Sequence, residues 1–235
     1  MLDLLDAHMH TIASGHAYST LSEMIDAGRK KGLKLIGITE HANVMPGTCH
    51  EIYFYNFKVI PRLQDGIEVR MGAEVNIIDF EGGTDLSEKA YSKIDYAIAS
   101  LHDNCIDPGS QEENTCAIIK AMQHPKVKII GHPDNGYYPV DYEKIVKAAK
   151  EYHVLLELNN SSAHPLTGRL NSQENIKTML KYCEKYQTEL IIDSDAHIHY
   201  DVGNHKYIHQ ILDEMHFSEE LIVNTSVDKF KKYVD

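Results

Sequence analysis

The stretch LKLIGITEH, from Leu33 to His41, shows the pattern that predicts the fold of this chain. A short, mostly apolar run of this length is typical of a β-strand that is buried on both faces. The run ends in an acidic residue and a histidine. The preceding segment, Thr20–Lys31, has the apolar spacing of an amphipathic helix and opens with a residue that caps helices well. A helix that leads into a buried strand is one step of a βα alternation, which favours a parallel sheet.

The same alternation continues over most of the chain. Apolar runs that predict strands are Leu2–Ala7, Leu33–Thr39, Val69–Asn76, Tyr96–Ser100, Lys128–Gly131, Val154–Asn159 and Leu190–Ser194. Segments that predict amphipathic helices are Thr20–Lys31, Gln111–Gln123, Asp141–Tyr152, Asn171–Tyr186 and Asn204–Met215. The short stretch Phe80–Gly83 is typical of a turn between two short strands. Strands and helices in this alternation predict an α/β protein whose parallel sheet closes into a barrel.

Length and composition predict a single domain over residues 1–235. The chain has 43% hydrophobic and 25% charged residues, which is ordinary for a globular protein with a sizeable core. Barrels of alternating strands and helices commonly occupy about 200 to 250 residues as one unit. No Pro-, Gly- or Ser-rich linker and no low-complexity tract divides the sequence, so we expect no domain boundary.

The net charge and the spacing of the cysteines indicate which partners the protein binds and which cellular compartment it occupies. The formal net charge of −12 repels polyanions, so we expect no nucleic-acid partner. The four cysteines, Cys49, Cys105, Cys116 and Cys183, are scattered without a C-x-x-C pair, as in a reduced cytoplasmic protein. The first residues lack the features of a secretion signal, and no stretch is apolar for long enough to span a membrane. We therefore expect a cytoplasmic protein without a membrane partner.

Histidines and carboxylates, the residue types that most often bind metals, follow nearly every predicted strand. Parallel strands of a barrel place their carboxyl ends at one mouth, where the chemistry of such proteins takes place. Only the sixth predicted strand ends in amides, Asn159 and Asn160, instead of a histidine or a carboxylate. The residues at the ends of the other strands are His8, His10, Glu40, His41, Glu74, His102, His132, Asp195 and His197. This placement indicates a common site and is more informative than any single motif.

The first of these motifs, HMHTIASGH from His8 to His16, has the spacing of a chelating pair. Side chains two apart in a strand point to the same face, so His8 and His10 stand side by side. His16 lies in the following loop. Glu74 falls inside an apolar run, where a carboxylate without a cation would be costly to bury, so we interpret it as a carboxylate that bridges metal ions.

The candidate ligand set consists of seven histidines, one glutamate and one aspartate. Nitrogen and oxygen donors of this kind suit Zn, Mn or Fe, and nine ligands exceed what one ion can use, so two or three ions are expected. The remaining histidines lie in predicted loops or on helices, and we expect them at the surface: His50, His124, His153, His199, His205, His209 and His216.

With these motifs assembled, the sequence resembles the PHP (polymerase and histidinol phosphatase) family, most closely its YcdX-type phosphatase branch. The four family motifs match as HMH, TEH, GHP and DSDAH, from His8 to His197. The resemblance implies a distorted (β/α)7 TIM-like barrel with a trinuclear site at the carboxyl ends of the strands. One position departs from the usual motif, because Glu40 stands where the family commonly has aspartate. Glu40 is not among the nine ligands, so we expect it to affect ligand orientation and not the number of metals.

The same resemblance implies how the ligands are shared among three divalent ions, most commonly zinc, with manganese or iron as alternatives. The first ion would take His8, His10, Glu74 and Asp195; Glu74 would bridge to a second, held also by His102 and His132; the third would take His16, His41 and His197. It also implies a phosphatase that hydrolyses phosphate monoesters of small metabolites with a metal-bound hydroxide. The residues assigned to catalysis are Glu74, His102, Asp195 and His197.

Several alternatives stay open from the residues alone. A histidinol-phosphate phosphatase would share the whole site, and a non-catalytic metal-binding protein would need no open coordination position. A polymerase-type exonuclease is disfavoured because no basic groove is evident. An amidohydrolase also opens with H-x-H, but no lysine ends the middle strands here. Arg169 follows the sixth strand and suits either a phosphate contact or a solvated loop; Ser161 and His164 are weaker candidates for phosphate contact.

Overall fold

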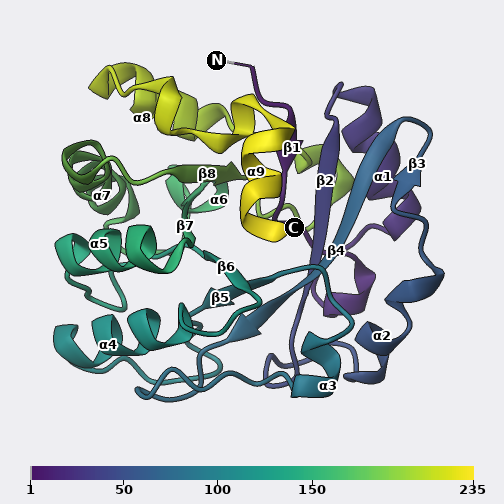
Figure 1. Ribbon diagram of the computed structural model, residues 1–235, viewed down its shortest axis with the longest axis horizontal. Helices are drawn as coiled ribbons and strands as arrows, with labels where there is room; N and C mark the ends of the chain where they lie inside the picture. Colours follow the sequence, from purple (N-terminus) through teal and green to yellow (C-terminus); the bar gives the residue numbers. More distant parts are fainter. Residues whose placement is uncertain (1) are drawn as a thin grey trace.

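The computed structural model describes residues 2–235, and all of its strands belong to one sheet (Figure 1). Seven strands are parallel in the order β1-β2-β4-β5-β6-β7-β8 and form a nearly closed barrel, which confirms the predicted fold class. The short β3 pairs antiparallel with β4 and was not predicted. The strands are β1 (Leu5–Asp6), β2 (Leu35–His41), β3 (Leu63–Gln64), β4 (Ile67–Asn76), β5 (Ala97–Ser100), β6 (Val127–Ile130), β7 (Leu155–Asn159) and β8 (Leu190–Asp193).

The five predicted helices are present, each within two residues of its predicted bounds. The helices of the described chain are α1 (Leu21–Lys30), α2 (Ile52–Tyr55), α3 (Glu88–Tyr91), α4 (Gln111–Ala121), α5 (Tyr142–Tyr152), α6 (Asn160–Ala163), α7 (Ser172–Tyr186), α8 (Lys206–Met215) and α9 (Val227–Val234). Short 3-10 turns lie at Ile12–Ser14, Phe57–Val59, His199–Asp201, Glu219–Leu221 and Val223–Thr225.

Local sequence explains where the longer helices begin. Thr20 and Ser110 each form a capping box with the glutamate three residues later, at the start of α1 and α4. Asp141 caps α5 by accepting from the backbone N–H of Lys144. Helices α4, α5 and α7 lie along one side of the sheet, as Figure 1 shows. The unpredicted α2, α3 and α6 have four residues each and are too short to show a helical period in the sequence, whereas α9 has eight residues with helical apolar spacing and was missed.

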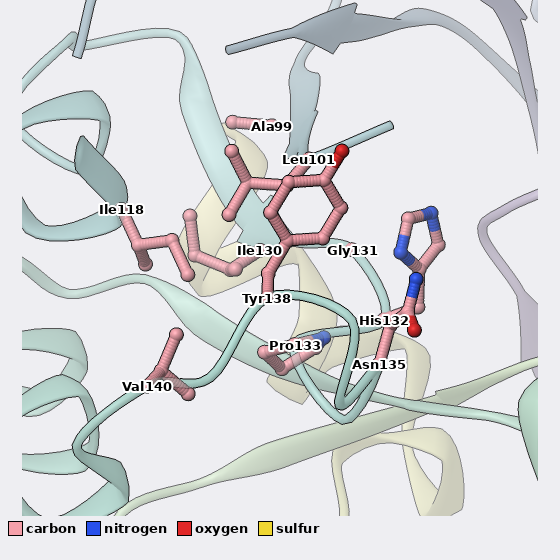
Figure 2. A pocket seen from close by; sticks show the side chains of 10 residues that line it. All are labelled: Ala99, Leu101, Ile118, Ile130, Gly131, His132, Pro133, Asn135, Tyr138 and Val140. Carbon is pink, nitrogen blue, oxygen red and sulfur yellow. The ribbon is translucent and has the colours of Figure 1, made fainter. Parts of the chain in front are cut away.

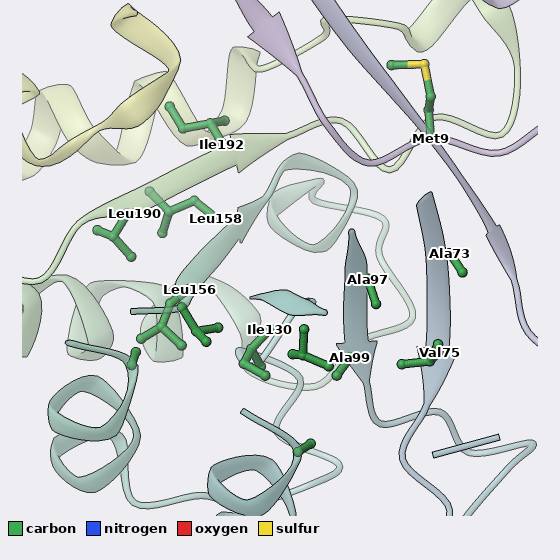
Figure 3. Close-up of a cluster of buried hydrophobic side chains, with 14 of the residues drawn as sticks. Met9, Ala73, Val75, Ala97, Ala99, Ile130, Leu156, Leu158, Leu190 and Ile192 are labelled. Carbon is green, nitrogen blue, oxygen red and sulfur yellow. The ribbon is translucent and has the colours of Figure 1, made fainter. Parts of the chain in front are cut away.

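The larger hydrophobic core lies between the strands and the surrounding helices. Alternate residues of β4 to β8 supply the sheet side of this layer, and Figure 3 shows several of them, among them Val75, Ala99, Leu156 and Ile192. All four side chains are fully buried. Strands buried on both faces explain why the sequence showed apolar runs instead of a strict alternation.

A second apolar cluster fills the barrel at the amino ends of the strands. It contains Leu5, Leu35, Tyr96, Ile98, Ile129, Leu155, Ile191, Val223 and Phe230, with Phe230 contributed by α9. The rings of Tyr96 and Phe230 meet edge to face at 5.7 Å. Gly37 leaves room for Tyr96, because a Cβ on Gly37 would lie 1.9 Å from the tyrosine hydroxyl. The barrel is therefore a packed core at this end.

The seam between β1 and β8 is closed by isolated contacts. Met9 and Ala196 form a parallel bridge at the carboxyl end. Below it, the buried side chain of Asn224 donates to the carbonyls of Leu5 and Ile192 and accepts from the N–H of Ile192. One amide thus replaces missing strand pairing, a role that the sequence did not reveal. Among residues 2–235, no helix combines the length and the hydrophobicity needed to cross a membrane.

Candidate metal centre

The carboxyl ends of the strands bring all nine predicted ligands to one mouth of the barrel. An open cavity of about 380 Å³ lies there, lined by His16, His41, Met45, Pro46, Glu74, His102, Asn104, Arg169, Asp195 and His197. His8, His10 and His132 are buried next to this cavity. The register of the parallel strands places these ends together; for example, His41 on β2 lies beside Glu74 on β4.

Four donor atoms form a compact first group. His8 Nε2 lies 3.1 Å from His10 Nε2 and 3.3 Å from Glu74 Oε2. His10 Nε2 lies 3.4 Å from both Glu74 Oε2 and Asp195 Oδ1, which is itself 3.7 Å from His8 Nε2. Tetrahedral zinc with ligand bonds of about 2.0–2.1 Å has donors separated by about 3.3–3.4 Å. The donors of His8, His10 and Glu74 therefore have nearly the spacing of a tetrahedral site, and Asp195 lies beside both rings as a fourth donor.

The other oxygen of Glu74 belongs to a second group. Glu74 Oε1 lies 3.1 Å from His132 Nε2 and 3.3 Å from His102 Nε2. It also accepts a hydrogen bond of 2.7 Å from Ser100 Oγ. Each oxygen of Glu74 thus faces a different set of imidazoles, which is the arrangement that a bridging carboxylate requires.

The third predicted group is looser than the other two. The ring centroid of His16 lies 4.9 Å from that of His41 and 4.8 Å from that of His197, while the last two are 6.0 Å apart. His41 Nδ1 lies 2.8 Å from Glu74 Oε2, so this ring leans toward the first group. His16 is exposed, whereas His41 is buried. All three histidines line the cavity, but the histidine nitrogens that lie within 4.8 Å of one another belong to His10, His41 and His197.

Mutual pairing sets the protonation of the buried groups. Burial alone would raise the pKa of Glu74, but the surrounding imidazoles of His8, His102 and His41 hold it well below its usual range. Burial opposes protonation of His8, yet Glu157 and Glu74 raise its pKa well above the ordinary value. Burial lowers the pKa of both His132 and His197 to about 4, so both rings are neutral donors near pH 7.

A buried carboxylate that the sequence analysis missed, Glu157, orients the first and second groups. Its Oε1 accepts from His8 Nδ1 at 2.6 Å, and its Oε2 accepts from the backbone N–H of His132 at 2.6 Å. A metal-binding histidine usually donates its second N–H to such a partner. The signal in the sequence is an acidic residue inside the apolar run Val154–Asn159, the same signal that identified Glu74.

Glu40 lies outside the candidate ligand set. Its carboxylate accepts from the backbone N–H and hydroxyl of Thr11 and from the hydroxyl of Ser14. Ser14 Oγ in turn lies 3.2 Å from His10 Nδ1 and accepts from the N–H of His41. The longer side chain of glutamate thus reaches the histidines through Ser14.

Arg169 lies at the wall of the cavity and not in a solvated loop. One terminal nitrogen donates to Asn159 Oδ1 and Ser162 Oγ, and the other donates to Asp195 Oδ2 at 3.0 Å. These bonds fix the guanidinium beside a candidate ligand. The other loop candidates contribute less, because Ser161 is exposed and His164 packs against Tyr207.

Two candidate ligands have left-handed backbone conformations. The φ angles are 29° at His132 and 54° at Asp195, which is uncommon for residues with a side chain. The N–H of Asp195 donates to the carbonyl of His8, and the N–H of His132 donates to Glu157. Figure 2 shows Tyr138, Val140 and Ile118 lining a small, largely apolar pocket together with His132 and Pro133. Hydrogen bonds and packing together hold the two ligands in place.

The prediction that all remaining histidines lie at the surface was wrong for His205, which is 3% exposed. His205 precedes α8 and contacts Asp3, a contact between the two ends of the chain that local sequence does not show. His209 is partly buried beside the same aspartate. His50, His153 and His216 are exposed, as predicted.

Comparison with known proteins places the chain in a family. A barrel of parallel strands with histidines and carboxylates at its mouth is an architecture of metal-dependent hydrolases. The family model for the PHP domain matches residues 6–216, and the chain belongs to this family.

Relatives with similar sequences cover nearly the whole chain. A protein named probable phosphatase from Caldicellulosiruptor saccharolyticus is 46% identical over 98% of this chain and 95% of its own length. One from Clostridium novyi, also named probable phosphatase, is 45% identical over 98% of this chain and 94% of its own length.

Among solved structures, the histidinol phosphate phosphatase of Lactococcus lactis, complexed with zinc, L-histidinol and phosphate, has a similar fold. Its TM-score is 0.63 at 16% identity, with 93% of this chain and 95% of the other covered.

Proposed function

We propose that this chain is a metal-dependent phosphatase that hydrolyses phosphate monoesters of small metabolites. The single observation that supports this most strongly is the division of Glu74, whose two oxygens face two different groups of imidazoles at 3.1–3.4 Å. A bridged cluster of divalent ions in an open cavity suits phosphoryl chemistry, which needs charge neutralisation on several oxygens at once. The similarity to proteins named probable phosphatases supports the same proposal.

The donor set fits three divalent ions. Glu74 Oε2 and His41 Nδ1 are buried 2.8 Å apart, and neither makes a hydrogen bond of acceptable geometry with the other or with any other group, as expected of atoms that bind metal. His8, His10, Glu74 and Asp195 would hold the first ion, and Glu74, His102 and His132 the second. His16, His41 and His197 would hold the third. Imidazole and carboxylate donors suit zinc, and they also accept manganese or iron.

Bound divalent ions would supply positive charge to the phosphoryl oxygens and lower the pKa of the water that acts as nucleophile. The chain itself contributes position and further charge. Arg169 is fixed by Asn159, Ser162 and Asp195 at the cavity wall, where its planar fork suits phosphate oxygens. Glu157 holds His8 and the His132 backbone in their orientations. Bound ions together with Arg169 would supply positive charge at the mouth of a chain whose formal net charge is −12.

A histidinol-phosphate phosphatase is the nearest alternative, and the composition of the cavity disfavours it. Recognition of the amine of histidinol calls for a carboxylate that is not engaged elsewhere. Of the ten residues that line the cavity, the carboxylates are Glu74 and Asp195, and both belong to the candidate ligand set. We therefore favour a phosphatase that recognises mainly the phosphate group.

The test is a substrate panel on protein of defined metal content. Chelator-treated protein is reloaded with Zn²⁺, Mn²⁺ or Fe²⁺ and assayed with p-nitrophenyl phosphate, sugar phosphates, nucleoside monophosphates and histidinol phosphate. We expect no turnover without metal and turnover of several monoesters with it. Activity confined to histidinol phosphate would establish the alternative. Tight metal binding with no hydrolysis of any phosphoester would identify a non-catalytic metal-binding protein.

A further inference from the structure

A second cluster of metal-binding side chains lies outside the mouth of the barrel. It consists of Asp3, which precedes β1, and of His205 and His209 at the start of α8, and we call it the distal triad. Asp3 Oδ2 lies 2.8 Å from His205 Nδ1 and 2.6 Å from His209 Nε2. The ligand atoms of all three residues lie within 4.8 Å of one another. None of the nine residues at the mouth takes part.

The distal triad has the donor types and the chain arrangement of a chelate. Its nitrogen–oxygen distances of 2.8 and 2.6 Å are those of hydrogen bonds, so an ion bound among the three donors would lengthen them. His205 and His209 are four residues apart, so their rings lie on one face of α8, as in helical zinc-binding pairs. The carboxylate of Asp3 approaches both rings from a separate segment. Two imidazoles and one carboxylate from two chain segments provide three ligands, and water or the second Asp3 oxygen can complete a tetrahedral set.

The hydrogen bonding of the triad is incomplete without a cation. Both rings face the same oxygen of Asp3, while Asp3 Oδ1 is buried without a partner. The other ring nitrogen, His205 Nε2, has no hydrogen-bond partner and lies 3.9 Å from Asp6 Oδ2. His205 is 3% exposed, so water does not readily satisfy its ring. A divalent ion among the three donors would engage the free carboxylate oxygen.

We propose that Asp3, His205 and His209 bind a divalent late transition-metal ion such as Zn²⁺ at a site separate from the mouth. Nitrogen and oxygen donors of this kind favour Zn²⁺ over Mg²⁺ or Ca²⁺, which prefer oxygen ligands alone. The role of the site is structural. It joins the segment before β1 to α8, next to the seam where Asp6 accepts from Ser194 and from the N–H of Gly203.

The test is the zinc content of wild-type protein and of an H209Q variant after dialysis against buffered Zn²⁺. His209 is partly exposed, with 27% of its side chain accessible, so glutamine can replace it without disturbing the core. We expect H209Q to bind one zinc ion fewer per chain than wild type and to keep its phosphatase activity. The matched control is H216N, because His216 lies at the other end of α8 in a left-handed conformation that asparagine tolerates.

Equal zinc content in wild type, H209Q and H216N would overturn the proposal and leave a hydrogen-bonded triad without metal. A measurement on unaltered protein gives the same decision without relying on any variant. Crystals grown with Zn²⁺ and measured at the zinc absorption edge should show an anomalous peak between Asp3 and His205. Peaks at the mouth without one at the distal triad would also refute the site. Neither result depends on which phosphoester the mouth hydrolyses, or on whether it hydrolyses one.

Discussion

The two ends of the barrel interior bury different kinds of residue on the same strands. On β7, Leu155 lies in the apolar cluster at the amino end, and Glu157 lies two residues on at the mouth. On β8, Ile191 belongs to the same apolar cluster, and Asp195 follows beyond the carboxyl end of the strand. On β7 and β8, the side chains inside the barrel therefore change from apolar to ionisable toward the carboxyl end. Apolar packing therefore occupies the amino end of the barrel interior, and the candidate metal ligands occupy the carboxyl end.

The physical reason lies in the cost of burying charge. A buried carboxylate or imidazolium is unfavourable unless it is paired, and the mouth contains several of them in mutual contact. The apolar end and the layer beneath the helices supply free energy that offsets this cost. Substitutions at the mouth should therefore change activity and metal binding, whereas substitutions at the amino end should change the free energy of unfolding.

The largest effect is expected at Glu74. An E74Q variant loses the charge that faces both groups of imidazoles, so turnover of p-nitrophenyl phosphate should fall by at least about 10³-fold, since metal-ion charge stabilisation contributes several kcal/mol. Metal content should also fall. The matched control is E68Q, on the same strand but paired with Arg70 and Lys231 away from the mouth. Retained activity in E74Q would show that this carboxylate is not a bridge.

The opposite end of the barrel is tested at Phe230, which is fully buried against Tyr96. An F230A variant should be destabilised by about 3–5 kcal/mol, because the cavity left in a packed core adds to the lost burial. Urea unfolding measures this. At a temperature where the variant is folded, the activity per metal-loaded molecule should stay near wild type. The control is L63A, where the side chain is 70% exposed and the expected change is about 0.5 kcal/mol or less.

A loss of activity in folded, metal-loaded F230A would break the comparison. It would mean that packing at the amino end sets the positions of ligands at the mouth, and that the two ends are not independent.

The sequence predicted the residues at the mouth better than the other contacts, because the same local pattern recurs at the strand ends. Each apolar run is local, and a histidine or carboxylate directly after it, such as His41 or His132, points to the same end of the sheet. Glu157 was missed although it follows the same logic as Glu74, an acid inside an apolar run. Its partners, His8 and the backbone of His132, are distant in sequence, so its role becomes visible only in the folded chain.

Contacts between distant segments account for the other gaps in prediction. Asn224 closes the barrel seam and His205 meets Asp3 across about the whole chain, and neither pairing leaves a local pattern. The region between β2 and β4 contains short elements, α2 and β3, whose lengths are below one clear period of a helix or strand. Local periodicity therefore predicts the repeated units, whereas the closure of the barrel depends on tertiary contacts.

The distal triad allows a separate test, because its titratable groups lie away from the mouth and their effect on stability can be measured independently. In metal-free protein, burial opposes charge on His205, but Asp3 and Asp6 raise its pKa to about 10 from 6.5. A raised pKa stabilises the fold fully below pH 6.5, and this contribution is lost as the pH rises toward 10. With chelator present, the difference in unfolding free energy between wild type and H205Q should shrink by about 3 kcal/mol or less from pH 6.5 to 9.

A difference between wild type and H205Q that stays constant over this pH range would contradict the pairing of a charged His205 with Asp3. The two proteins share all ionisable groups at the mouth, so titration of those groups cancels in the comparison.

The smallest effect is expected at Glu157, which orients two candidate ligands, His8 and His132, and is not itself one of the nine. An E157Q variant keeps the shape of the side chain but loses the charge that fixes the ring of His8 and the N–H of His132. Zinc affinity at the mouth should fall by about 10- to 100-fold, as for other partners of metal-binding histidines, with activity restored at high zinc. Competition with a chelator measures this, and E151Q on the exposed face of α5 is the control. If excess zinc fails to restore activity, Glu157 takes part in the reaction itself. The catalytic groups would then include a residue that lies behind the candidate metal ligands.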